Sequence, residues 1–195
     1  MKHRALYEQL SGLVDIPEAQ WLKAEALGRE QRLKKKELFV RPGDPSDRIG
    51  LVLSGVFRAF RVSAKGEESV KAFRAEGEMI GPYAEQLQGI ASLTAIEALE
   101  PSVVLVFRAR DLATLEQGHP CWTMLARRVA EQAFIIKERR EQEFLDLSAE
   151  ERLENFEREA PHLKGRVPQR EVAAYLGITE VALSRIISRR RRRQG

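Results

Sequence analysis

The spacing of apolar residues changes along this chain, and each change predicts a different kind of secondary structure. Up to about residue 36 the pattern is helical: "PEAQWLKAEALG" begins with Pro17, which a first helical turn tolerates, and ends on Gly28, a common stop signal. Residues 37–110 instead carry short apolar runs cut by Gly and Pro; "VFRAFRV" alternates with a period of two, and "SAKGE" has the composition of a hairpin turn. Several short strands at this spacing predict a sandwich or a barrel-like roll.

From Ala109 the spacing is helical again. "DLATLEQG" predicts a short helix that ends at Gly118, and a long helix follows from about Pro120 to Leu147. At about 1.5 Å per residue the long helix would extend on the order of 40 Å. Its apolar residues form a main stripe, interrupted by Arg140, and a thinner second stripe. The main stripe consists of Trp122, Leu125, Ala126, Val129, Ala133, Ile136, Phe144 and Leu147, and the second of Met124, Phe134, Ile135 and Leu145.

Two apolar stripes on one helix need two partners. One stripe can cover the roll, and the other favours a second copy of the chain in a coiled-coil-like dimer; a helix that only crosses its own domain fits the pattern nearly as well. "LSAEERLENFEREAP" then predicts a further helix, because Ser148 and Glu151 fit a capping box and Pro161 marks the end. "HLKGRVP" is the predicted linker to the last segment.

That segment, "QREVAAYLGITEVALSRIISRRRRR", predicts two helices joined by a tight turn. Residues 169–176 form the first helix, Gly177 permits the left-handed backbone of the turn, and Thr179 can cap the second helix. The small Ala173 suits a close crossing of the two helices, and the spacing to the later apolar positions is that of a helix-turn-helix. An ordinary surface hairpin would not explain an exposed face of Ser and Arg. The inward-facing residues are Val172, Ala173, Leu176, Leu183, Ile186 and Ile187.

Groove chemistry assigns roles to the exposed side chains of this pair. The second helix is expected in the major groove of DNA, where Arg185 can donate two hydrogen bonds to guanine and Ser184 can bond a base edge or a phosphate. Val181 can pack on a thymine methyl group. Glu180 can accept a hydrogen bond from the amino group of cytosine, or its charge can interact favourably with the helix dipole. Arg170 is expected to contact a phosphate. The predicted DNA-binding residues are Arg170, Thr179, Glu180, Val181, Ser184, Arg185, Ser188 and Arg189.

The charge of the chain is segregated. The net charge is +4, but residues 161–195 hold nine Lys/Arg against Glu171 and Glu180, a balance of +7, which leaves −3 for residues 1–160. A basic segment beside an acidic one points to a polyanionic partner. The run Arg189–Arg193 points all round its helix, so it either attracts phosphate or is a solvated chain end.

Composition excludes several classes of protein. No apolar run approaches the roughly 18 residues of a membrane span, and the N-terminus carries no apolar signal region. Cys121 is the only cysteine, which rules out an internal disulfide, a Cys-based zinc site and a four-cysteine iron–sulfur cluster, and favours the cytoplasm. Three scattered His and one Cys offer no catalytic constellation, so neither an enzyme nor a bound cofactor or metal is expected.

With "RPGD", "VLSG", "GEMIG" and "VPQREVAAYLGITEVALSRII" in place, nearly the whole chain resembles the Crp/Fnr superfamily of bacterial transcription regulators. The resemblance implies an α+β fold: a cyclic-nucleotide-binding-like β-roll with flanking helices at 1–118, a dimerisation helix at 119–147, and a helix-turn-helix domain at 148–195. It also implies a homodimer on a palindromic DNA operator, with half-sites about 34 Å apart, and RNA polymerase as a partner if the protein is an activator. The implied dimer-helix residues are Trp122, Leu125, Val129, Ala133 and Ile136.

The ligand cassette of this family does not carry over. Relatives that bind a cyclic nucleotide use a Glu for the ribose hydroxyl and an Arg–Ser pair for the cyclic phosphate. This chain has Pro82 at the Glu position and Ser92–Leu93 at the position of the Arg–Ser pair. The pair of hydroxyl side chains that the family has on its dimer helix falls at about residues 135–136, which are both Ile here. A buried phosphate without its cation costs several kcal/mol, so no high-affinity cyclic-AMP binding is expected. The degenerate cassette positions are Gly77, Glu78, Met79, Ile80, Gly81, Pro82, Tyr83, Ser92, Leu93 and Thr94.

The resemblance supplies no effector for this chain. The cysteine count excludes the iron–sulfur branch of the family. Haem-sensing relatives ligate through His or Cys, for which His3, His119, His162 and Cys121 are available; His119 and Cys121 are expected at the start of the long helix for structural reasons.

Two further departures concern DNA. The family usually has a Glu where Val181 stands, so its familiar half-site is not expected here. A β-hairpin wing normally follows the recognition helix, whereas Arg189–Gly195 follow it here, and the arginines could replace the phosphate contacts of the wing. The leading hypothesis is a sequence-specific, dimeric transcription regulator that does not respond to cyclic AMP. The alternative is a small-molecule sensor or protein-interaction module that binds nucleic acid only non-specifically.

Overall fold

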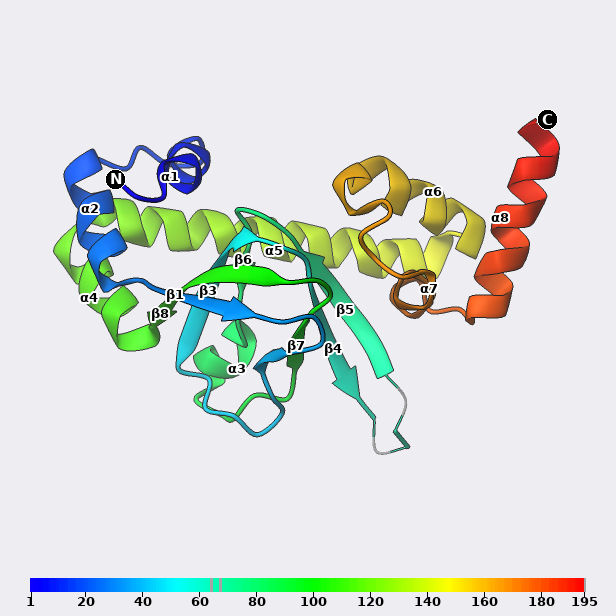
Figure 1. Ribbon diagram of the computed structural model, residues 1–195, viewed down its shortest axis with the longest axis horizontal. Coiled ribbons are helices and arrows are strands. Elements are labelled where there is room, and N and C mark those ends of the chain that lie inside the picture. The colour runs from blue at the N-terminus through cyan, green and yellow to red at the C-terminus, as the bar shows by residue number, and fades with distance from the viewer. Residues whose placement is uncertain (64, 67, 195) are drawn as a thin grey trace.

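The computed structural model describes residues 1–63, 65–66 and 68–194, and it confirms the predicted α+β class. A β-roll lies at the centre, a long helix runs along most of the molecule, and a small helical domain ends the chain (Figure 1). The helices are α1 (Arg4–Ser11), α2 (Glu18–Leu27), α3 (Tyr83–Gln88), α4 (Ala109–Gly118), α5 (Pro120–Asp146), α6 (Ala149–Glu159), the 3₁₀ turn η1 (Pro161–Leu163), α7 (Gln169–Leu176) and α8 (Glu180–Gln194).

The roll consists of two antiparallel four-stranded sheets, with strand orders β1-β8-β3-β6 and β2-β7-β4-β5. Side chains of both sheets alternate inward and bury an apolar core between them, with Phe39, Phe57 and Val104 fully enclosed. The strands are β1 (Arg29–Leu33), β2 (Leu38–Val40), β3 (Arg48–Ser54), β4 (Phe57–Val62), β5 (Glu68–Arg74), β6 (Met79–Ile80), β7 (Ala95–Ala98) and β8 (Ser102–Arg108).

The hairpin of β4 and β5 contains one irregularity in its register. Ala59 pairs with Ala72 and Phe60 with Val70, so Lys71 is an extra residue on β5. A bulge of this kind changes which side chains share a face of the strand. The hairpin is as predicted, but the turn expected at "SAKGE" includes residues 64 and 67, which lie outside the described residues.

The prediction of helix up to about residue 36 is wrong beyond α2. Pro17 and Gly28 flank α2 as expected, but Gly28 takes an extended conformation and the chain continues directly into strand β1, which pairs with β8. A Cβ atom at Gly28 would lie 2.6 Å from Cδ1 of Leu105, so glycine also permits the close approach of the chain to the sheet. The strand is fixed by this pairing and by burial of Leu33, which helical spacing alone could not reveal.

Helix α5 begins in its own chain's core and then leaves it. Trp122 and Cys121 are buried against α1, α2 and α4, with Leu125 packed beside them. Trp122 therefore stabilises its own subunit, and its place on the predicted dimer helix stays a prediction. Further along, Phe134 and Ile135 are exposed in the single chain. Within the described residues, no helix combines the length and apolarity needed to cross a membrane.

The C-terminal helical domain has the predicted local structure. Ser148 and Glu151 form the expected capping box at the start of α6. Gly177 adopts the left-handed conformation, with φ +69°, between α7 and α8. The Oγ1 atom of Thr179 accepts the backbone N–H of Ala182 at 3.2 Å and so caps α8. The buried core of the domain consists of Leu153, Ala173, Leu176, Leu183 and Ile186.

Candidate nucleic-acid interface

One side of α8 is buried and the other presents the predicted reading residues to solvent. Val181 is 61% exposed, and Ser184, Arg185 and Ser188 are also exposed, all on the side opposite the domain core. Glu180 is exposed in the first turn, where a carboxylate suits the positive end of the helix dipole. The side chains that the sequence assigned to base contacts therefore share one accessible face.

Arg170 and Arg189 are held by carboxylates of the same chain. Arg170 stands on α7, largely exposed, and its Nε donates to Oε1 of Glu171 at 2.9 Å. Arg189 donates to Oε2 of Glu150 on α6 at 2.6 Å. Any phosphate contact by Arg170 or Arg189 would compete with these internal partners.

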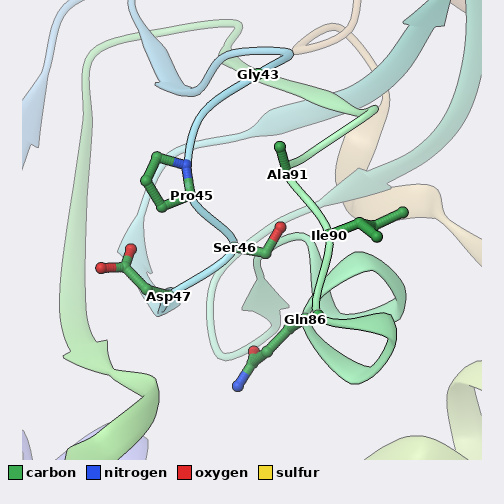
Figure 2. Close-up of a pocket in the computed structure, with 8 residues that line it drawn as sticks. Gly43, Pro45, Ser46, Asp47, Gln86, Ile90 and Ala91 are labelled. Carbon is green, nitrogen blue, oxygen red and sulfur yellow. The ribbon is translucent and has the colours of Figure 1, made fainter.

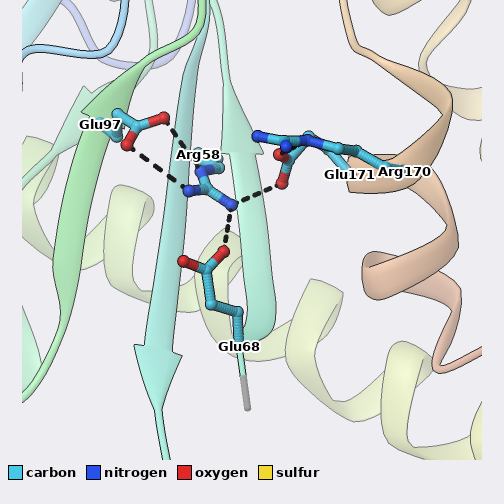
Figure 3. Close-up of polar contacts among 5 residues, drawn as sticks. All are labelled: Arg58, Glu68, Glu97, Arg170 and Glu171. Carbon is cyan, nitrogen blue, oxygen red and sulfur yellow. Dashed lines mark hydrogen bonds and ion pairs between the residues drawn. The ribbon is translucent and has the colours of Figure 1, made fainter. Parts of the chain in front are cut away.

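Glu171 also ties α7 to the roll through a buried guanidinium (Figure 3). Nη1 of Arg58, on β4, donates to Glu171 and to Glu68 at 2.6 Å each, and its Nε donates to Glu97 at 3.3 Å. Arg58 is 4% exposed and Glu171 is 3% exposed. Burial alone would lower the pKa of Arg58, but the hydrogen bond to Glu68 and the charges of Glu171 and Glu97 outweigh burial and raise it. We call Arg58, Glu68, Glu97 and Glu171 the junction cluster.

Arg166 makes a second charged contact between the roll and the helical domain. Its guanidinium donates to Glu76 at 2.7 Å and to Glu100 at 2.5 Å. The hydrogen bond from Arg166 lowers the pKa of Glu76 to about 2, so this carboxylate is ionised at neutral pH. The junction is thus held by charged groups from both sides.

An apolar contact accompanies these ion pairs. The rings of Phe73 on β5, Phe156 on α6 and Tyr175 on α7 form a triangle with centroid distances of 5.3 to 6.0 Å. Arg140 of α5 lies over the ring of Tyr175 and donates to the carbonyl oxygens of Val70 and Tyr175 at 2.8 Å. Helices α6 and α7 are therefore docked on the sheet that contains β4 and β5.

The ligand cassette holds internal contacts at the positions that the resemblance marked. Pro82 is buried ahead of α3, and Leu93 is exposed. The Ser92 hydroxyl is buried and donates to the carbonyl oxygen of Thr94 at 2.8 Å. The other cassette positions form strand β6 (Met79, Ile80), the segments that flank it (Gly77, Glu78, Gly81) and the first residue of α3 (Tyr83).

A carboxylate that the sequence did not single out lies beside this cassette. Glu85 is 2% exposed; it accepts from the Thr94 hydroxyl at 2.8 Å and from Arg61 at 3.1 Å. Burial alone would raise the pKa of Glu85, but these hydrogen bonds outweigh it and the pKa is lowered. The Arg61 guanidinium is thus already paired with an internal anion.

A shallow cavity of about 360 Å³ lies between the "RPGD" loop and α3 (Figure 2). Its described lining includes the Asp47 carboxylate and no cation, so it does not suit a phosphate. The lining residues are Gly43, Pro45, Ser46, Asp47, Gln86, Gly89, Ile90 and Ala91.

Sequence reasoning found the face of α8 but missed the junction cluster. One signal was available: Glu171, Ala174 and Tyr175 are spaced as one helical face, distinct from the face of Ala173 and Leu176. A helix with two faces of this kind contacts two partners, which here are α8 and the roll.

Comparisons with known proteins agree with this architecture. Residues 30–119 match the cyclic nucleotide-binding domain family. The chain is 25% identical to the transcriptional activator protein anr of Pseudomonas aeruginosa, over 85% of this chain and 71% of that protein. It is 24% identical to the anaerobic regulatory protein of Pasteurella multocida, over 83% of this chain and 62% of that protein, and so spans less than two thirds of the second relative. The structure of FixK2 from Bradyrhizobium japonicum superimposes with a TM-score of 0.72 at 20% identity, over 86% of each chain.

Proposed function

We propose that this chain is a transcription regulator of the Crp/Fnr type with a cyclic nucleotide-binding domain, rather than an enzyme, and that it binds a palindromic DNA operator as a homodimer. The observation that carries the proposal is the exposed face of α8, where Arg185, Ser184 and Val181 project from a capped helix with a buried opposite side. A helix of this shape fits the major groove, and a dimer would place two of them about 34 Å apart.

The proposal is tested by selecting bound sequences from a random duplex pool and then substituting the central reader. In the selected operator we expect a palindrome with a guanine in each half-site. Replacement of Arg185 by alanine should weaken operator binding about 5- to 150-fold for each lost guanine contact, because a bidentate base contact is worth about 1–3 kcal/mol. Gel-shift titration against operator and random duplex measures both affinities.

One control variant and one contradicting outcome complete this test. Arg110→Ala removes an exposed arginine on α4, at the opposite end of the molecule from α8, and should leave both affinities within about twofold. If the wild-type chain binds random and selected duplexes equally, the alternative function, a sensor or interaction module with non-specific nucleic-acid binding, replaces the proposed one.

The roll is proposed not to respond to cyclic AMP. Support comes from Leu93 and Ser92 at the phosphate-binding positions, one exposed and apolar, the other engaged within its own turn. Arg61 is paired with the buried Glu85 carboxylate, which would repel an incoming phosphate. At the two phosphate-binding positions a cyclic phosphate would therefore meet Ser92 and Leu93 in place of the Arg–Ser pair, and the nearby Arg61 is already engaged.

Isothermal titration with cyclic AMP tests this directly. We expect no saturable heat at micromolar nucleotide and no shift of the thermal unfolding midpoint at millimolar nucleotide, because a ligand that does not bind the native state cannot stabilise it. Micromolar affinity would overturn this part of the proposal without affecting DNA recognition.

A further inference from the structure

The terminal arginine run is divided between two faces of α8. Arg189, Arg190 and Arg193 lie on the side that packs on α6: Arg190 comes four residues after the buried Ile186, and Arg193 comes seven after it. Arg191 and Arg192 lie on the opposite side, since they follow the exposed Ser188 by three and four residues. Both are exposed and continue the reading face toward the chain end.

An acidic face of α6 contacts the first set of arginines. Glu150, Glu154 and Glu157 recur at a spacing of four and then three residues, which places them on one side of the helix. The ion pairs join Arg189 to Glu150 at 2.6 Å, Arg193 to Glu150 at 3.6 Å, and Arg190 to Glu157 at 2.9 Å and to Glu154 at 3.7 Å.

We propose that the acidic face of α6 competes with DNA phosphates for Arg189, Arg190 and Arg193, and that Arg191 and Arg192 are the phosphate-binding arginines of the run. The inference rests on the proposed function and refines it, because the sequence placed Arg189 among the DNA-binding residues. The acidic face limits the sequence-independent part of DNA binding.

Counterion release gives the proposal a distinctive signature. An arginine that meets a phosphate releases condensed cations from DNA, and each such contact steepens the slope of log affinity against log salt by about 0.9. An arginine already paired with a carboxylate must abandon it, and the freed carboxylate then attracts a cation from solution. Release and uptake offset each other, so the paired arginines contribute little to the salt slope.

A matched pair of variants tests the division of the run on a random-sequence duplex. Arg191→Gln/Arg192→Gln should flatten the salt slope by about 1.8, the value for two phosphate contacts. Arg189→Gln/Arg190→Gln removes the same charge from the same segment and should flatten it by less than half as much. Equal effects of the two double variants would overturn the proposal.

Removing the carboxylates of α6 should have the opposite effect and strengthen DNA binding. Glu150→Gln/Glu154→Gln/Glu157→Gln should raise affinity for random duplex about tenfold, because the exposed ion pairs of these carboxylates no longer oppose binding. The salt slope should steepen by up to about 2.7 as three arginines become available. The gain should disappear when Arg189, Arg190 and Arg193 are also changed to Gln. A gain that survives those changes would contradict the proposal.

A charge-matched control separates local pairing from net charge. Glu8→Gln/Glu18→Gln/Glu116→Gln removes three exposed carboxylates near α1, α2 and α4, at the far end of the molecule from α8 (Figure 1). It should leave the salt slope unchanged; a slope change equal to that of the α6 variant would show a general charge effect and sink the inference. The tests of this inference use affinity for random duplex, which does not depend on operator preference. Failure of the proposed function would instead appear as equal affinities of the wild-type chain for operator and random duplex, so the two failures can be distinguished.

Discussion

Replacing Arg58 by methionine is expected to lower the free energy of unfolding by about 3–5 kcal/mol, the usual cost of removing one partner from a buried ion pair. Arg58 is the guanidinium shared by Glu68, Glu97 and Glu171, and its own side chain is almost fully enclosed. Methionine keeps an apolar stem but removes the guanidinium, which lies over the ring of Phe60, and leaves the carboxylates of Glu171 and Glu97 without this cation. Urea unfolding followed by circular dichroism measures the loss as a lower midpoint.

Two further variants identify the cause of that loss. Arg32→Met changes an exposed arginine on β1 and should stay within about 0.5 kcal/mol of wild type. Adding Glu171→Met to Arg58→Met should restore part of the stability, because an apolar pair at a buried site often equals an ion pair. A loss below about 1 kcal/mol for Arg58→Met would mean that the cluster contributes little, and that the aromatic triangle and the Arg166 contact hold the junction.

The parts of the fold that were predicted correctly depend on neighbours in the sequence. The capping box of Ser148 and Glu151, the left-handed Gly177 and the cap by Thr179 each involve residues within four positions of one another. Such contacts form largely irrespective of the rest of the chain, so residue type and spacing suffice to predict them.

The parts that were missed depend on distant pairing. Strand β1 is fixed by β8, more than 60 residues later, and helical spacing in the preceding segment concealed it. Arg58 and Glu171 are 113 positions apart. From the sequence alone, each would be interpreted as an exposed charged residue. Arg140 is a similar case: the sequence showed it only as an interruption of an apolar stripe, whereas in the fold it stacks on Tyr175 and donates to carbonyl oxygens of β5 and α7.

The distal half of α5 presents apolar side chains that its own subunit does not cover. Phe134 is 63% exposed and Ile135 is 55% exposed, near the middle of the helix, and Leu145 is 79% exposed near its end. Adjacent large apolar residues at this exposure are unusual on a monomer, and they belong to the second stripe, for which the sequence favoured a second copy of the chain as the partner. The parallel with Crp/Fnr-type regulators makes a second copy of the chain the expected partner.

Phe134→Glu/Ile135→Glu is therefore expected to weaken self-association by more than about a thousandfold. Each subunit loses two apolar contacts worth about 1.5–3 kcal/mol and places two carboxylates in the interface, at several kcal/mol for each unpaired charge. Analytical ultracentrifugation should show a folded monomer, and operator affinity should fall to that of a single half-site, because the monomer presents one copy of α8. Leu87→Glu/Ile90→Glu makes the same chemical change on exposed apolar residues at and after α3 and should leave the dimer intact. A Phe134→Glu/Ile135→Glu variant that sediments as a dimer would place the interface elsewhere, and the spacing of the two recognition helices would then need another scaffold.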